Sequence, residues 1–181
     1  MAHADTAAAR LHELAAYYRE HPVTGPVEGH TATVTAAAPL QLGTLDHIRA
    51  AVQEVADHTR TVNPDAGPLP RSAEDVYDWM RQHTQHADEV EQQRAEVIEY
   101  RQWLEHCLLA GDHETVHKRV RRQSCPECGC WTLIWMPEAT RAVCTNTECV
   151  DRDGFSTTLS LSRLAHVHVT TRQNVRQARA T

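Results

Sequence analysis

The sequence predicts an α+β fold, in which a mainly α-helical N-terminal part is followed by a small β module and a basic C-terminal helix. Three observations support this prediction. Apolar residues recur at helical spacing over much of the first 110 residues. Four cysteines between positions 125 and 149 flank a segment rich in β-forming residues. The last 19 residues contain four arginines and no acidic residue.

The composition is that of a folded protein with one domain or two small ones. The net charge is −6, but residues 1–111 hold 17 acids and 8 bases, whereas residues 112–181 hold 7 acids and 10 bases. This asymmetry indicates either a nucleic-acid contact at the basic end or an unevenly charged soluble surface.

Neither a membrane span nor a secretory signal is found in the sequence. No apolar run approaches the roughly 18–20 residues that cross a bilayer, and the N-terminus lacks a basic region followed by an apolar one. We therefore expect a cytoplasmic protein without membrane contact. Its six cysteines are then expected to be thiols or metal ligands rather than disulfides.

Two helices are predicted in the N-terminal region, residues 1–71. The first covers about 6–20 and ends before Pro22, because the residue preceding a proline is pushed out of the α region. The second covers about 45–59, with Thr44 as its N-cap. A loop rich in proline and glycine joins them and is expected to contain one short strand.

Residues 72–122 are predicted to form either one long helix or a helical hairpin with a break near 83–87. Ser72 and Asp75 have the spacing of a capping box at its start. An apolar seam with a nearly seven-residue repeat follows, which indicates core packing within the chain or, as the alternative, a coiled-coil homo-oligomer. The seam consists of Val76, Met80, His83, Ala87, Val90, Val97, Leu104 and Leu108.

A basic run joins this region to the cysteines. Its charges either complement the C-terminal dipole of a helix or contact nucleic-acid phosphates. The run contains Lys118, Arg119, Arg121 and Arg122.

The cysteines have the spacing of metal ligands, C-x2-C followed by C-x4-C. Four thiolates close the coordination shell of a tetrahedral ion, so the sequence predicts a structural Zn2+ and a zinc ribbon over residues 123–162. Iron is the alternative metal, although the C-x4-C spacing does not favour it. Cys107 and Cys130 are expected to lie outside the shell. The predicted ligands are Cys125, Cys128, Cys144 and Cys149.

The residues around the ligands predict how the ribbon folds. Pro126 sets a turn, and Gly129 permits the positive φ that brings backbone N–H groups toward the sulfurs. Strands are predicted at 131–135 and 141–143, which form a hairpin between the cysteine pairs, and a third strand at 155–161. So small a module buries little apolar surface, so the metal is expected to contribute to its folding.

Several patterns typical of enzymes are absent from the sequence. It has no P-loop, no nucleophile elbow, no Rossmann fingerprint and no His-x-Glu element of the zinc deaminases. A closed four-cysteine shell also leaves no position for a catalytic water. We therefore expect a protein that is not an enzyme.

The tail, residues 163–181, permits two interpretations. Leu164-Ala165 and the residues after it have the length of a helix-turn-helix centre, in which Thr171 would cap a recognition helix. Val169, at the usual place of the turn glycine, favours the alternative of a single basic helix. The candidate nucleic-acid contacts here are Arg172, Gln173, Asn174 and Arg176.

Residues 72–165 resemble a group of uncharacterised proteins of actinobacteria and their phages. The resemblance implies helices followed by a four-cysteine zinc ribbon, with a location in the host cytoplasm or the virion, and it implies no activity. It is carried by Asp78-Trp79-Met80, Trp103-Leu104, the basic run, Cys125-Pro-Glu-Cys-Gly129, Thr132-Leu133, Val143-Cys-Thr-Asn-Thr-Glu-Cys149, Asp153-Gly154 and Leu164-Ala165.

Two hypotheses for the function follow. The first is a non-enzymatic zinc-ribbon protein that binds nucleic acid, with DNA as the expected partner, as an accessory or regulatory protein of phage or actinobacterial origin. The alternative is a protein–protein interaction module, such as a phage structural or assembly component. In that case the acidic helices form the interface and the ribbon is a rigid cap.

Overall fold

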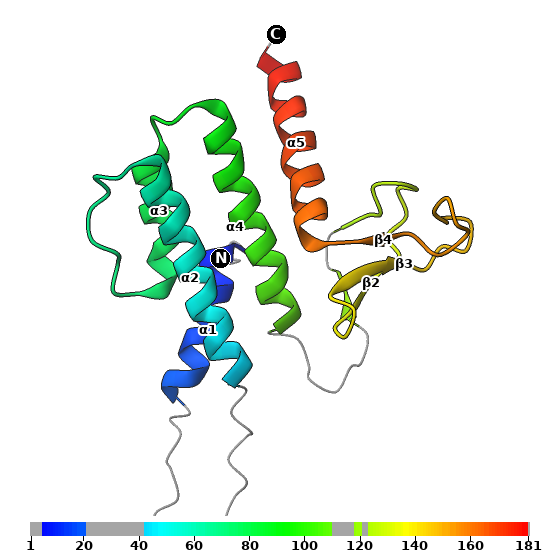
Figure 1. Cartoon of the computed structure of the whole chain (residues 1–181), viewed down its shortest axis with the longest axis horizontal. Coiled ribbons are helices and arrows are strands. Elements are labelled where there is room, and N and C mark those ends of the chain that lie inside the picture. Colours follow the sequence, from blue (N-terminus) through cyan, green and yellow to red (C-terminus); the bar gives the residue numbers. More distant parts are fainter. Residues whose placement is uncertain (1–4, 21–41, 110–117, 121–122, 181) are drawn as a thin grey trace, which may run out of the picture.

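The computed structural model describes residues 5–20, 42–109, 118–120 and 123–180. Figure 1 shows a body of four α-helices, a fifth helix beside the last of them, and a small antiparallel sheet next to the start of that fifth helix. The predicted α+β class is therefore confirmed. Within the described residues no helix has the length and apolarity needed to cross a bilayer.

Both predicted N-terminal helices are present, as α1 (Ala7–Glu20) and α2 (Leu42–Val62). The Thr6 hydroxyl caps α1 by accepting a hydrogen bond from the Ala9 N–H at 3.2 Å. The predicted N-cap Thr44 is wrong, because α2 begins earlier and Thr44 is buried within its first turn. The predicted short strand between the helices lies outside the described residues.

The next region is a helical hairpin, one of the two predicted forms. A single 3-10 turn (Ala73–Asp75) leads into α3 (Val76–Thr84), and α4 (Glu89–Leu109) follows after a short break. The predicted capping box is wrong, because the Ser72 side chain makes no cap hydrogen bond. A side-chain cap is found at the next helix: at the start of α4 the Asp88 carboxylate accepts a hydrogen bond from the Glu91 N–H at 2.8 Å.

The break explains why the apolar seam does not form one continuous stripe. Val76, Met80 and Leu104 are buried in the core of this chain, whereas Val90, just after the break, is 70% exposed. The interpretation as core packing therefore holds for those three residues, and a straight coiled-coil helix over the whole seam is wrong.

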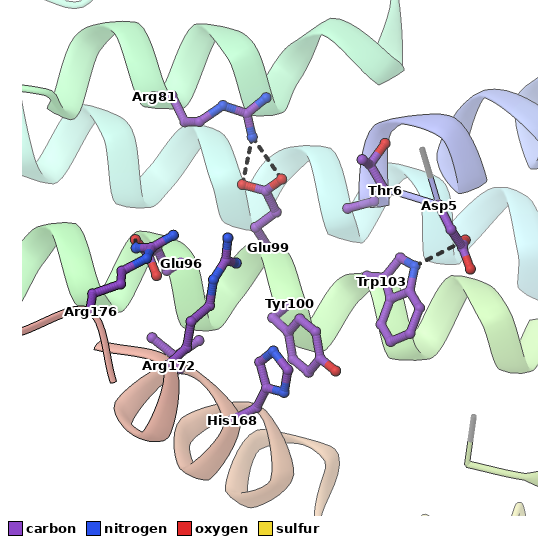
Figure 2. Close-up of a pocket in the computed structure, with 12 residues that line it drawn as sticks. Asp5, Thr6, Arg81, Glu96, Glu99, Tyr100, Trp103, His168, Arg172 and Arg176 are labelled. Carbon is purple, nitrogen blue, oxygen red and sulfur yellow. Dashed lines mark hydrogen bonds and ion pairs between the residues drawn. The ribbon is translucent and has the colours of Figure 1, made fainter. Parts of the chain in front are cut away.

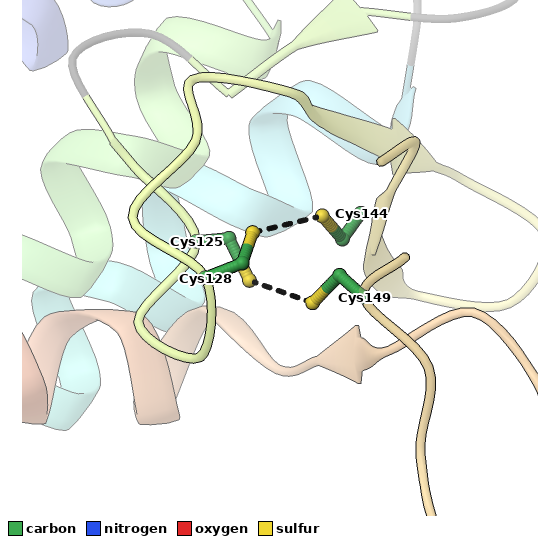
Figure 3. Close-up of side chains that lie close together, drawn as sticks. All are labelled: Cys125, Cys128, Cys144 and Cys149. Carbon is green, nitrogen blue, oxygen red and sulfur yellow. Dashed lines mark hydrogen bonds between the residues drawn. The ribbon is translucent and has the colours of Figure 1, made fainter. Parts of the chain in front are cut away.

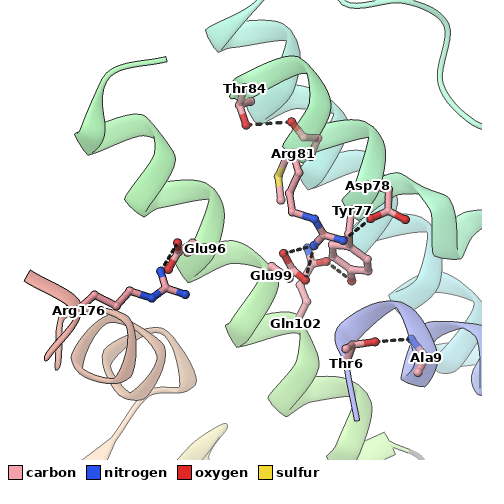
Figure 4. A network of polar contacts seen from close by, with 11 residues as sticks. Thr6, Ala9, Tyr77, Asp78, Arg81, Thr84, Glu96, Glu99, Gln102 and Arg176 are labelled. Atoms are coloured by element: carbon pink, nitrogen blue, oxygen red, sulfur yellow. Dashed lines mark hydrogen bonds and ion pairs between the residues drawn. The ribbon is translucent and has the colours of Figure 1, made fainter. Parts of the chain in front are cut away.

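A chain of hydrogen bonds runs through the interior of the helical body, and Figure 4 shows Tyr77 and Gln102 at its centre. Gln102 Nε2 donates to a Glu54 carboxylate oxygen at 2.8 Å, so Gln102 Oε1 accepts from the Tyr77 hydroxyl at 2.7 Å. The Tyr77 oxygen then accepts from His106 Nε2 at 2.9 Å, which leaves His106 Nδ1 to accept from His47 Nε2 at 3.0 Å. Burial lowers the pKa of both imidazoles, so this pattern corresponds to two neutral rings, each protonated at Nε2.

The sheet contains four short antiparallel strands in the order β1-β2-β3-β4. The predicted hairpin is present, with Leu133 opposite Cys144 and Met136 opposite Arg141. The basic run supplies an edge strand rather than the end of a helix. The strands are β1 (Lys118–Arg119), β2 (Leu133–Met136), β3 (Arg141–Cys144) and β4 (Thr158–Leu159).

The third predicted strand is shorter than expected, because a helix begins directly after it. The Ser160 hydroxyl accepts from the Arg163 N–H at 3.1 Å and caps α5 (Leu161–Ala180). This helix is continuous through Thr171, so the helix-turn-helix interpretation is wrong and the single basic helix is confirmed. Val169, at the supposed turn, is instead a buried contact of the helix.

One hydrophobic core joins the helical body to the sheet. Trp103 and Leu104 of α4, Leu164 of α5 and Leu133 of β2 are all buried members of it. Beside this core, α4 and α5 are also in contact through the stacked rings of Tyr100 and His168, whose centroids lie 3.9 Å apart. The sheet is therefore attached to the helical body through α5.

The buried imidazoles predict that the helical body loses stability in mild acid. Burial, reinforced by His47 and Arg101, lowers the pKa of His106 to about 3, whereas the unfolded chain takes up this proton near pH 6.5. The contribution is complete above pH 6.5 and is lost as the pH falls toward 3, by on the order of 2–3 kcal/mol between pH 7 and pH 4.

Chemical denaturation of a His106→Gln variant, followed by helical circular dichroism across this pH range, tests the point. The variant should show a flatter pH dependence than the parent protein. Thr59→Val is the matched control, because it removes another buried hydrogen bond of the helical body, from Thr59 Oγ1 to the Val55 carbonyl, but leaves His106 and its partners in place, so its slope should equal that of the parent. Equal slopes for His106→Gln and the parent would contradict the assignment.

Candidate metal centre

The four predicted cysteine ligands converge beside the sheet, as Figure 3 shows. Their sulfur atoms all lie within 4.8 Å of one another. The Cys125–Cys149 sulfurs are 3.8 Å apart and the Cys128–Cys144 sulfurs 3.7 Å apart. A tetrahedral ion with sulfur ligands at about 2.3 Å requires sulfur–sulfur separations of about 3.8 Å. The cluster therefore has the dimensions of a metal site, and these separations are far too long for disulfide bonds.

The first cysteine pair is held by a tight turn of the backbone. The Cys125 N–H donates to the Cys130 carbonyl at 2.8 Å, and the Gly129 N–H donates to the Cys125 carbonyl at 2.7 Å. Gly129 has a φ of 74°, a conformation that side-chain-bearing residues rarely adopt. The turn predicted from Pro126 and Gly129 thus places the first two sulfurs on the same side of the chain.

The second pair is positioned by the sheet. Cys144 ends β3, and its N–H donates to the Thr157 carbonyl at 2.9 Å. The Cys149 N–H donates to the Asn146 carbonyl at 3.0 Å, and the Cys149 carbonyl accepts from the Thr157 N–H at 3.1 Å. The C-x4-C loop is therefore attached at both ends to the strand that leads into α5.

Two threonine hydroxyls complete the surroundings of the sulfurs. Thr132 Oγ1 lies 3.2 Å from the Cys144 sulfur, and Thr157 Oγ1 lies 3.3 Å from the Cys149 sulfur. Once the cysteines are thiolates, both hydroxyls become donors to them. Outer hydrogen bonds of this kind orient ligands and tune metal affinity.

The charge state of the cluster also fits a bound cation. Burial raises the pKa of the Cys125 thiol to about 12, whereas the backbone N–H of Cys130 lowers that of Cys128 to about 6. Cys125 and Cys144 are completely buried. The raised pKa keeps Cys125 a neutral thiol, so four thiolates in so enclosed a place would need a compensating positive charge, which a divalent metal would supply.

Cys107 and Cys130 lie outside this group of four. The Cys130 sulfur accepts a long hydrogen bond from Asn146 Nδ2 at 3.7 Å, so it lies near the ligands but bonds to an amide. The pKa of Cys130 is raised by its hydrogen bond with Cys128 and by the charge of that thiolate.

The residues predicted to contact nucleic acid are divided between two places. Lys118 Nζ donates to the Leu108 carbonyl at 2.6 Å and so satisfies a backbone acceptor in the last turn of α4. Arg119 is exposed on the edge strand. Arg121 and Arg122 lie outside the described residues. On α5, Arg172, Asn174 and Arg176 are exposed and Gln173 is half-buried.

A cavity of about 600 Å3 lies between α4 and α5, beside the start of α1 (Figure 2). It contains both signs of charge: Arg81 Nη1 contacts the Glu99 carboxylate oxygens at 2.7 and 2.6 Å, and Arg176 contacts Glu96 at 3.3 Å. Burial and the charge of Arg172 lower the pKa of His168, which favours its neutral form. Two of its three arginines thus pair with carboxylates, so the charge of this cavity is mixed.

A second hollow, of about 650 Å3, lies between the first cysteine turn and α5 and was not predicted from the sequence. Trp131 lines it from the ribbon side and is 66% exposed. Arg172, Arg176 and Arg179 line it from the helix side, and none of its described lining residues is acidic. We call it the knuckle groove. The sequence pointed to Arg172 and Arg176 as candidate contacts, but it gave no sign that Trp131 lies opposite them.

The sequence also contains a motif typical of catalytic zinc sites, which the prediction of a non-enzymatic protein did not take into account. Residues 113–117 read His-Glu-Thr-Val-His, which is H-E-x-x-H, the pattern of many zinc hydrolases. Its continuation departs from the longer metzincin pattern, because Val120 and Gln123 stand where glycine and histidine are needed. These five residues lie outside the described part of the chain, so the absence of enzymatic activity stays a prediction.

Comparisons with protein-family models, with curated proteins and with solved structures find no match to this chain. The fold and the site themselves define a helical protein with an attached antiparallel sheet and a four-cysteine cluster that can hold a metal ion. This arrangement is compatible with a zinc ribbon.

The cluster predicts selective effects of cysteine substitutions. Cys144→Ser should lower zinc affinity by more than about 100-fold, which exceeds the usual cost of losing an outer hydrogen bond. Cys130→Ser is the matched control and should retain one zinc per chain, because its sulfur lies outside the cluster. Metal content after gel filtration and competition with a chromogenic chelator measure both values. Equal losses in the two variants would contradict the ligand set.

Proposed function

We propose that this chain is a non-enzymatic zinc-ribbon protein that binds nucleic acid as an accessory or regulatory protein, of phage or actinobacterial origin. The observation that carries the proposal is the knuckle groove, whose described lining includes three arginines and no acidic residue. Helix α5 contains no aspartate or glutamate over its whole length. A positive strip of this kind attracts phosphates.

The arginines of α5 have the spacing of a phosphate-binding row. Residues 172, 176 and 179 lie at i, i+4 and i+7, so they share one face of the helix. The row extends over about 10 Å, given a rise of 1.5 Å per residue. That length corresponds to about three nucleotides of stacked strand.

Zinc has a supporting role in this proposal. The metal fixes the first cysteine turn, and that turn forms the wall of the groove opposite α5. A closed cysteine shell offers no open coordination site. The metal therefore shapes the surface, and the side chains of the groove would make the contacts.

Binding of the zinc-loaded protein to labelled oligo(dT) and to a random-sequence duplex, each titrated with salt, tests the proposal. At least one of the two should bind at low salt and weaken linearly on a log–log plot. The double variant Arg172→Glu/Arg179→Glu should reduce the slope by about 1.4 for a single strand or about 1.8 for a duplex, as expected for two lost phosphate contacts.

The matched control is Arg152→Glu/Arg163→Glu, which makes the same change in net charge at exposed residues outside the groove. Arg163→Glu also completes a capping box with Ser160, so it does not weaken α5. This control should bind much more tightly than the groove variant. Absence of binding to either nucleic acid at low salt would overturn the proposal.

A protein–protein module is the second candidate, and one observation favours it. The loop after the second cysteine pair exposes two apolar side chains, Phe155 at 71% and Val150 at 50%. The acidic helices are less suited to an interface than their charge indicates, because Glu96 and Glu99 already pair with arginines of the same chain. Under this alternative, Phe155→Ala would abolish partner binding, and the groove arginines would not matter.

The H-E-x-x-H pattern raises a separate possibility, a zinc-dependent hydrolase. In such enzymes the glutamate is the general base. Peptidase assays of the zinc-loaded protein and of Glu114→Gln decide it: activity that is lost in the variant would establish an enzyme, and the proposal above expects none.

A further inference from the structure

We propose that the knuckle groove is a binding site for single-stranded nucleic acid, in which one base stacks on Trp131 and the adjoining phosphates contact the arginine row of α5. This inference rests on the proposed function and specifies its substrate class. The two walls of the groove carry different chemistry, an aromatic face and a line of cations, and single-strand sites combine these two elements.

The aromatic wall is unusual for its exposure. Trp131 is 66% exposed, whereas Trp79 and Trp103 are buried in the core. A tryptophan left in water costs hydrophobic free energy, and it lies here in a concave surface rather than on a convex one. Every nucleobase has a flat face that such a ring can cover.

The residues on both sides of Trp131 are bonded to the cysteine cluster. It directly follows Cys130, whose carbonyl accepts from the Cys125 N–H at 2.8 Å, and it precedes Thr132, whose hydroxyl lies 3.2 Å from the Cys144 sulfur. Both neighbours of the indole are thus tied to the cysteine cluster. Because the backbone that carries the indole is held before binding, less entropy is lost when the ligand arrives.

The cationic wall is narrow. Helix α4 presents carboxylates along one edge of the row: Glu96 pairs with Arg176 at 3.3 Å, and Glu89 accepts from Gln177 Nε2 at 3.3 Å. Arg172 and Arg179 are therefore the main phosphate contacts of the row. These acids would repel a second phosphate strand that lay beside the first. The positive strip therefore fits one strand better than the two strands of a duplex.

The size of the groove agrees with this substrate. Its volume of about 650 Å3 falls within the range of about 300–1,000 Å3 typical of pockets for drug-sized ligands, which include a nucleotide. Apolar side chains also line it, including Pro126 of the cysteine turn and Val167 of α5. In a duplex the base faces are covered by their neighbours, so stacking on Trp131 would require a base to be flipped out.

The test compares short labelled oligo(dT) with the same length of duplex, by fluorescence anisotropy at one low salt concentration. The parent protein should bind the single strand at least about tenfold more tightly. Trp131→Ala should weaken single-strand binding by about 5- to 150-fold, the range for one base–aromatic stack, whereas Trp131→Phe should keep most of the affinity. Phe155→Ala, an exposed aromatic residue of the ribbon outside the groove, is the matched control and should bind as the parent does.

The outcomes separate this inference from the proposed function. In one outcome duplex and oligo(dT) bind equally, Trp131→Ala has no effect, and Arg172→Glu/Arg179→Glu still weakens binding. The protein then binds nucleic acid as proposed, but the single-strand inference is wrong. If neither nucleic acid binds the zinc-loaded parent, the proposed function and the single-strand inference are both wrong. Metal content and the circular dichroism of Trp131→Ala, which should match those of the parent, exclude loss of the fold as the cause of weaker binding.

Discussion

The contact of four cysteine sulfurs is the constraint on which the second half of this molecule depends. Two of the four strands in the sheet contain only two residues, and such strands have little stability of their own. The cluster ties the first turn to β3 and to the C-x4-C loop, and this loop is bonded to Thr157, just before β4. Ser160 then caps α5, so the start of the helix follows from the same set of bonds.

Helix α5 combines two roles that usually belong to different elements. One face is buried against α4 through Leu164, Ala165 and Val169, and it joins the ribbon to the core of the helical body. The other face carries the arginine row beside the cysteine turn. Because one rigid helix carries both faces, the groove keeps its shape as long as the core and the metal site are intact. The acidic and basic parts of the sequence therefore lie side by side in the structure, the acidic residues on α4 and the basic residues on α5.

The parts that follow from local rules could be predicted from the sequence. The helices around Leu11 and Val55, the hairpin between the cysteine pairs and the ligand set all depend on periodicity and spacing. Errors arose where tertiary packing decides. Thr44 has the residue type of an N-cap, but α2 begins earlier and buries it, and Ser72 has the spacing of a capping box, but its side chain makes no cap hydrogen bond. The knuckle groove could not be predicted, because Trp131 and Arg172 are far apart in the sequence and meet only through the position of α5.

The account depends most directly on a closed shell of four sulfurs around the metal. X-ray absorption at the zinc edge of the purified, zinc-loaded protein measures this shell without reference to any function. The account predicts four sulfur scatterers at about 2.3 Å and no nitrogen or oxygen ligand. A shell with nitrogen or oxygen, or with fewer than four sulfurs, would contradict it, because the cysteine turn would then not be fixed as one wall of the groove.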